Sequence, residues 1–132
     1  MELEAVSGPT EDCIELSLVP DSDGVLRADW ERLIGFLANG SLGSARAGAV
    51  FHESLARCVR AKAMAMRDKH GVTTVGLCGG VFQNARLACR SRALLEGCGF
   101  HVLQACQIPC NDAGISAGQV MEALGGGLAE LS

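Results

Sequence analysis

Aromatic residues and runs of basic residues are scarce in this chain of 132 residues. It has no tyrosine, one tryptophan and four phenylalanines, and its formal net charge is −4. No segment interleaves basic with aromatic residues, a pattern common in nucleic-acid binding, so we expect no nucleic-acid partner. No run reaches about 18 uncharged apolar residues, the length that a membrane-spanning helix needs, so we expect no membrane partner either.

The chain also lacks the cationic start of a secretory signal peptide. It begins with the acidic stretch Met1-Glu2-Leu3-Glu4, and we therefore predict a cytoplasmic protein. Seven cysteines are present. Because disulfides are rare in the cytosol, we expect free thiols, most of them acting as small buried hydrophobic residues.

Small apolar residues, by contrast, are in excess. Hydrophobic residues make up 48% of the chain before its 17 glycines are counted, whereas soluble domains show roughly 45–50% with glycine included. The length suits one domain or part of one. The surplus indicates that some apolar surface packs against a partner or against another part of the same fold.

The hydropathy pattern predicts an α/β chain in three regions: a lead-in over 1–40, a long helix within 41–70, and a β-α-β-α core over 71–126. The predicted elements are, in order, a strand (14–18), a turn (20–24), helices (30–38 and 42–70), a strand (72–78), a helix (81–98), a strand (100–105) and a helix from 111 or 112 to 124. Asp29 is the expected cap of the first helix. The expected buried faces are Leu33, Ile34 and Leu37 on the first helix and Ala117, Val120, Met121 and Leu124 on the last.

Two polar or glycine-rich corners follow the two strands of the core. Gly79-Gly80 leaves the first strand, and Asn111-Asp112 follows the second after a short loop. Strands joined by a helix are parallel in nearly all cases, so both corners should lie at the same edge of the sheet. Open parallel sheets bind ligands at that edge, and a helix start there attracts phosphate. The sequence therefore predicts one pocket shared by the two corners.

Each of these residues also has a structural interpretation. Gly79-Gly80 lacks the spacing of a known phosphate-binding fingerprint and suits a tight turn equally well. Asn84, expected one turn into the following helix, is either a contact to a base or ribose or a solvated polar residue. Asp112 is either a helix cap or a ligand for Mg²⁺ or another phosphate-bridging metal.

The histidines and cysteines indicate less. His52 lies among apolar residues of the long helix, where a lone histidine is usually a satisfied structural one. The spacing of Cys98, His101, Cys106 and Cys110 superficially suits a zinc knuckle, but the intervening residues are apolar, so we do not expect zinc there.

Three segments together resemble the motifs of one known family. Leu77-Cys78-Gly79-Gly80-Val81-Phe82-Gln83-Asn84 resembles L-S-G-G-V-F-Q-N, Asn111-Asp112-Ala113-Gly114-Ile115 with Gly118-Gln119 resembles N-D-G-G-I-x-x-G-Q, and Phe51-His52-Glu53-Ser54-Leu55-Ala56 resembles F-H-x-T-L-A. The family that they resemble is the HypF-type carbamoyltransferases of [NiFe]-hydrogenase maturation. The similarity extends along essentially the whole chain, and the beginning resembles an interior helix end of longer members. The resemblance therefore suggests the last part of such an enzyme, either a truncated piece or a separately encoded one.

The resemblance implies half of an actin-like (ASKHA, ribonuclease H-like) nucleotide-binding domain, related to the threonylcarbamoyl transferases. It implies that Gly79, Gly80 and Asn84 contact ATP or carbamoyl adenylate and that Asp112 helps hold a divalent metal, of the Mg or Fe type. It assigns no catalytic residue. The implied reaction transfers a carbamoyl group to the C-terminal cysteine of a partner protein, HypE, for the cyanide ligands of the hydrogenase iron.

Some departures limit that implication. Cys78, Cys110 and Ala113 replace the usual Ser, Pro and Gly, and the family's H-x-x-x-H metal ligands are missing because no two of the three histidines are four residues apart. We therefore expect the isolated chain to be inactive and to act with an upstream part of the enzyme. The alternatives are a catalytically silent binding or structural module and, less well supported because only two parallel strands are predicted, a free-standing flavodoxin-like nucleotide binder.

Overall fold

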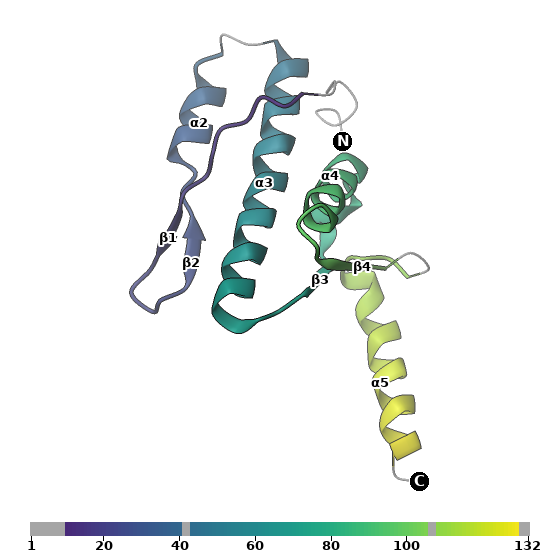
Figure 1. Cartoon of the computed structure of the whole chain (residues 1–132). Coiled ribbons are helices and arrows are strands. Elements are labelled where there is room, and N and C mark those ends of the chain that lie inside the picture. The colour runs from purple at the N-terminus through teal and green to yellow at the C-terminus, as the bar shows by residue number, and fades with distance from the viewer. Residues whose placement is uncertain (1–9, 41–42, 106–107, 130–132) are drawn as a thin grey trace.

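The computed structural model describes residues 10–40, 43–105 and 108–129. The elements are, in order, β1 (Leu18–Pro20), β2 (Leu26–Ala28), α2 (Glu31–Ala38), α3 (Ser44–His70), β3 (Thr74–Leu77), the 3₁₀ turn η1 (Gly80–Gln83), α4 (Ala85–Glu96), β4 (His101–Gln104), the 3₁₀ turn η2 (Asp112–Gly114) and α5 (Ile115–Ala129). The long helix α3 runs between the β1–β2 hairpin with α2 on one side and the β3–α4–β4 unit on the other (Figure 1). The chain is α/β, as predicted.

The lead-in differs from its prediction because it contains a hairpin. The strand expected at 14–18 is assigned only from Leu18, and it pairs antiparallel with β2, which was not predicted. The turn between them was predicted, and Asp21 closes it: its Oδ1 accepts the backbone N–H groups of Asp23 at 3.0 Å and Val25 at 2.9 Å. A three-residue strand is too short for the alternation that identified its neighbour.

Helix α2 begins one residue later than predicted, at Glu31, whose N–H donates to the Asp29 carboxylate at 3.0 Å. Leu33 is fully buried against Leu16 and Cys58. Ile34 was expected on the same face but is 59% exposed. The contact surface therefore follows the Leu33 side of the helix, because only that side faces α3.

Helix α3 and the β-α-β unit confirm the predictions for the centre of the chain. α3 ends at Gly71, which has a φ of 70° and donates its N–H to the Arg67 carbonyl at 2.7 Å. β3 and β4 are parallel, with Thr74 opposite His101 and Leu77 opposite Gln104. The core of this unit comprises Leu77, Leu95, Phe100 and Val102, with Val59, Ala63 and Met64 of α3 packed against it.

The burial prediction is also wrong for the last helix. Val120, Met121 and Leu124 are 58%, 64% and 61% exposed. In Figure 1, α5 extends away from the other elements. Its apolar spacing indicates a surface suited to packing, but helical periodicity does not show that a partner is present.

The described part of the chain also bears on the expectations for membrane-spanning helices and for disulfides. No helix there is both long and apolar enough to cross a membrane. The six described cysteines are free thiols, as expected, but only Cys58 is buried, whereas Cys78 and Cys89 are exposed.

Candidate functional site

The glycine turn and the aspartate corner meet at one rim, as predicted. Gly79 has a φ of 98°, a conformation that favours glycine, and its N–H donates to the Cys110 carbonyl at 2.6 Å. Cys110 directly precedes Asn111-Asp112. The backbone bond therefore brings the end of β3 against the corner that follows β4. We call Gly79, Gly80, Asn111 and Asp112 the rim.

The rim is open on its outer side. A Cβ atom added at Gly79 or Gly80 would meet nothing within 4 Å. Asp112 is exposed at the start of η2, while Asn111 caps that turn by accepting the Ala113 N–H at 3.1 Å. The capping interpretation of this corner thus applies to Asn111, and the Asp112 carboxylate faces solvent.

The corner also depends on a glycine at its far side. A Cβ on Gly114 would lie 2.4 Å from the Pro109 carbonyl oxygen, so no larger residue fits without a backbone shift. Gly118, one turn further along the chain, is not constrained in this way, because nothing lies within 4 Å of a Cβ added there.

Asn84 was predicted to lie one turn into a helix. It lies instead at the start of α4, because the 3₁₀ turn η1 separates the glycines from that helix. It is the N-cap of α4, and its Oδ1 accepts the Leu87 N–H at 2.9 Å. Its Nδ2 lies 2.8 Å from Nε2 of His52. The side chain therefore has two internal partners and is not the freely solvated group that one interpretation expected.

His52 is a satisfied buried histidine, as expected. Its side chain is on α3 and it is 3% exposed. Its Nδ1 lies 2.7 Å from the Gly48 carbonyl oxygen, one turn earlier in the same helix. Sequence reasoning missed its connection to Asn84, which is 32 residues away in the chain.

A buried carboxylate beside His52 joins α3 to α4, and it was not predicted. Glu53 is 3% exposed and accepts from Arg90 Nε at 2.7 Å, Arg90 Nη2 at 2.8 Å and Arg57 Nε at 2.7 Å. The pairing with Arg90 lowers the pKa of the Glu53 carboxyl, burial opposes that effect, and Arg57 adds to it. An acidic residue on a largely apolar helix face, with Arg57 four residues on, is the signal that could have identified it.

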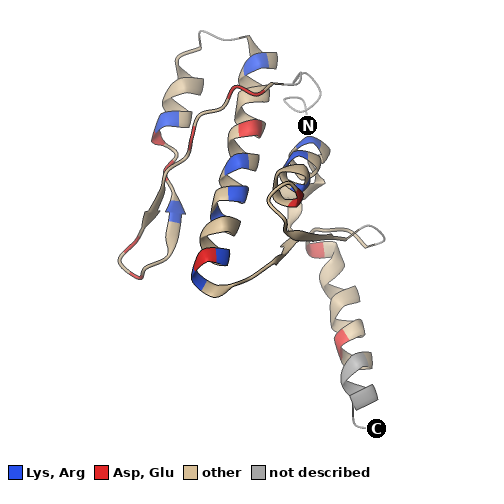
Figure 2. Cartoon of the chain, in the orientation of Figure 1, with Lys and Arg blue, Asp and Glu red and all other residues tan. Residues whose placement is uncertain are grey.

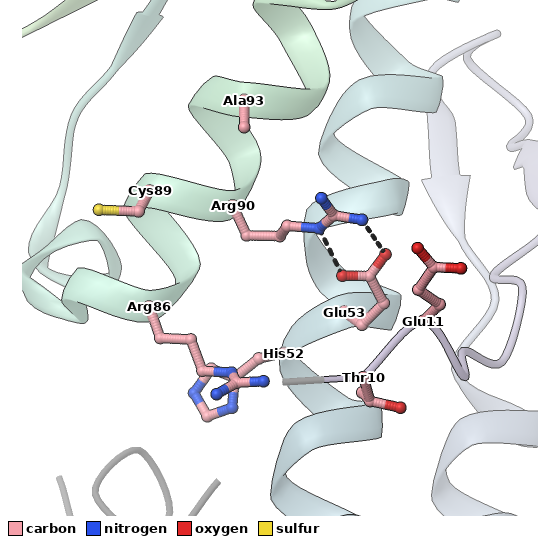
Figure 3. A pocket seen from close by; sticks show the side chains of 8 residues that line it. All are labelled: Thr10, Glu11, His52, Glu53, Arg86, Cys89, Arg90 and Ala93. Atoms are coloured by element: carbon pink, nitrogen blue, oxygen red, sulfur yellow. Dashed lines mark hydrogen bonds and ion pairs between the residues drawn. The ribbon is translucent and has the colours of Figure 1, made fainter. Parts of the chain in front are cut away.

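His52, Glu53 and Arg90 are among the residues that line a pocket of about 760 Å³ between α3 and α4 (Figure 3). Its lining residues are Thr10, Glu11, His52, Glu53, Arg86, Cys89, Arg90 and Ala93. The rim glycines and Asp112 do not belong to it. Acidic and basic side chains both line this pocket. On the exposed α5, by contrast, Glu122 is the only charged residue (Figure 2).

The described residues do not form a metal centre by themselves. Within them, no group of three or more His, Cys, Asp or Glu side chains lies close enough to hold a metal ion. Cys106 of the superficial zinc pattern lies outside the described residues. Asp112 supplies a single carboxylate, so a metal there would need ligands from elsewhere.

Comparison with known proteins decides the family. Residues 1–119 match the family model described as "Carbamoyltransferase, Kae1-like Domain, second subdomain". The chain belongs to this family. The three motifs therefore identified the family correctly, and the rim lies in its second Kae1-like subdomain.

Individual relatives agree with this family membership and are much longer than the matched region. A "Carbamoyltransferase HypF homolog" of Cupriavidus necator is 37% identical over 120 residues, which cover 89% of this chain and 30% of that protein. "Carbamoyltransferase HypF2" of the same organism is 42% identical over 81 residues, 61% of this chain and 10% of that protein. The crystal structure of a full-length HypF in the phosphate- and nucleotide-bound form has a TM-score of 0.83 and 30% identity, covering 89% of this chain and 16% of that one.

Proposed function

We propose that this chain supplies the nucleotide-facing rim of a HypF-type carbamoyltransferase, as half of an actin-like domain in the cytoplasm. Carbamoyl adenylate, made from ATP, would lie over Gly79 and Gly80 with Asn84 close by. The carbamoyl group would pass to the C-terminal cysteine of a HypE-type partner, for synthesis of the cyanide ligands of a [NiFe]-hydrogenase. The chain would act only together with the upstream part of such an enzyme, in the same polypeptide or as a separately encoded piece.

The observation that carries the proposal is the 2.6 Å bond from the Gly79 N–H to the Cys110 carbonyl. It joins the two corners at the edge where parallel sheets bind ligands. Because Gly79 and Gly80 have no side chain, a phosphate has room to approach the backbone there. The first N–H groups of η1 have no acceptor within that turn and are suited to an anion. A similar full-length HypF, of which this chain matches 16%, crystallised in a nucleotide-bound form, which supports nucleotide binding by a protein of this family.

The reaction needs an orienting surface rather than a nucleophile from this chain. The partner's thiol loses its proton to solvent, and the thiolate sulfur attacks the carbamoyl carbon. A C–S bond forms, the C–O bond to the adenylate phosphate breaks, and AMP leaves with the electron pair. The rim would hold the adenylate in position and stabilise the charge that develops on its phosphate. Asp112 would add one ligand to a divalent metal whose other ligands come from outside this chain.

Replacing Gly80 with alanine tests the placement. The new Cβ meets nothing in the protein, so folding should change little while the methyl group occupies the space of the ligand. Isothermal titration calorimetry of the chain with AMP should show about tenfold weaker binding, equal to one lost charge-assisted hydrogen bond of about 1.5 kcal/mol.

Gly76→Ala is the matched control. Gly76 lies on β3, its φ is not positive, and a Cβ there also meets nothing within 4 Å. This variant should bind AMP like the wild type. Equal affinity in the Gly80→Ala and Gly76→Ala proteins would contradict the placement of the nucleotide at the rim.

A second candidate is a catalytically silent association module. The exposed apolar side chains of α5, among them Val120 and Met121 at 58% and 64% exposure, favour it. A chain that binds no AMP but forms a stable dimer by analytical ultracentrifugation, lost in Met121→Glu, would support this candidate instead.

A further inference from the structure

We infer that His52 is a positioning residue for the nucleotide rim, acting through a tautomer-specific hydrogen-bond chain to Asn84. The chain runs from the Gly48 carbonyl through the His52 ring and the Asn84 carboxamide to the Leu87 N–H. The inference rests on the proposed function only in placing the ligand beside Asn84. The hydrogen-bond chain itself belongs to the fold.

The direction of every bond follows from one fixed group. A backbone carbonyl can only accept, so His52 Nδ1, at 2.7 Å from the Gly48 oxygen, carries the proton. In the neutral ring Nε2 is then an acceptor, and the atom at 2.8 Å from it must be the amide nitrogen of Asn84. The Asn84 oxygen is thereby turned to the Leu87 N–H, which lies at 2.9 Å. The three contacts are mutually consistent only with the Nδ1–H tautomer.

The ring is held where it can impose this orientation. His52 is 3% exposed, and the neighbouring Glu53 binds Arg90 with two hydrogen bonds, which fixes α3 against α4. Asn84 follows η1 directly, and η1 begins at Gly80 of the rim. The described residues use one of the two Asn84 Nδ2 hydrogens. The other hydrogen would be donated to the ligand by an amide whose orientation is already set before the ligand binds. This lowers the entropy cost of ordering the side chain on binding.

Two substitutions at position 52 separate positioning from packing. In His52→Gln the amide oxygen can occupy the place of Nε2 and accept from Asn84, while the bond to Gly48 is lost. In His52→Asn the shorter amide can donate to Gly48 in place of Nδ1 but does not reach Asn84. Both variants remove the ring and keep a polar amide, so each controls for the other.

The experiment measures AMP affinity of the whole chain by calorimetry, with folding checked by circular dichroism. His52→Gln should bind AMP within about twofold of the wild type, and His52→Asn about threefold to tenfold more weakly, the effect of one hydrogen bond. Equal affinities in the two variants would overturn the inference.

A long-range ¹H–¹⁵N spectrum of the wild-type chain provides a readout that needs no nucleotide. The His52 ring should show the Nδ1–H tautomer, and the Asn84 side-chain amide signals should move in His52→Asn much more than in His52→Gln. An Nε2–H tautomer, or equal movement of those signals, would overturn the inference. If the wild-type chain binds no AMP while the spectra agree, the proposed function fails but the positioning of Asn84 by His52 stands.

Discussion

Replacing Arg90 with alanine should destabilise this protein more than replacing Arg57, although both arginines pair with the same buried carboxylate. Arg90 donates two hydrogen bonds to Glu53, at 2.7 and 2.8 Å, and Arg57 donates one, at 2.7 Å. Removing a partner of a buried charge costs about 3–5 kcal/mol when the whole pair is buried. Here the arginine side chains are 38% and 35% exposed, so solvent screening reduces the cost to about 2–3 kcal/mol for Arg90→Ala and about 1 kcal/mol for Arg57→Ala.

Urea denaturation followed by circular dichroism gives the free energy of unfolding for each variant. Arg46→Ala is the control, because Arg46 pairs with Asp12 at 3.0 Å in a setting where the two side chains are 65% and 60% exposed. It should change the stability by less than about 0.5 kcal/mol. Equal costs for Arg90→Ala and Arg46→Ala would refute the argument that the buried carboxylate depends on its partners.

The same ion pair makes stability depend on pH. Because its arginine partners lower the pKa of Glu53 in the folded state, the unfolded chain binds this proton more readily. The stabilisation is fully present above the unfolded pKa of about 4.3 and is lost as the pH falls through the folded value. The stability difference between the wild type and Glu53→Gln, which cannot ionise, should therefore shrink on acidification from about pH 6. A difference that stays constant would show that the ionised form contributes nothing.

Two further outcomes follow from burial. Leu95→Ala should cost about 2–5 kcal/mol in urea denaturation because Leu95 is 0% exposed, whereas Met121→Ala, at 64% exposure, should cost less than about 0.5 kcal/mol; similar costs would mean that α5 packs against the body. Burial raises the pKa of the Cys58 thiol, so mass spectrometry after iodoacetamide treatment at pH 8 should find Cys58 unmodified when the exposed Cys89 is fully alkylated. Alkylation at equal rates would contradict the burial of Cys58.

The centre of the fold could be predicted because its signals are local. The 27 residues of α3 carry a helical apolar pattern and end at a glycine with positive φ. Two short apolar strands on either side of a helix imply a parallel pair, and this places the Gly79 turn and the Asp112 corner at one edge. The rim was therefore predictable from residue order and the geometry of β-α-β units.

The rest could not be predicted because it depends on which surfaces meet. The strand β2 is too short to show a period, and nothing in the spacing of Val120 and Met121 shows whether a partner covers them. The helix predicted from Val81 begins only at Ala85, since the side chain of Asn84 caps it there. Periodicity gives the apolar side of a helix, but it does not give the residue at which a side chain ends the first turn.

The sequence by itself determined the family, the order of the elements and the shared edge of the two corners, since motif spacing and chain connectivity are properties of residue order. Tertiary structure alone decided how that edge is held. Asn84 meets His52 across 32 residues and Arg90 meets Glu53 across 37. Hydrogen bonds between side chains so far apart in the chain form only when α3 and α4 pack at one particular distance and rotation, and no local pattern specifies these.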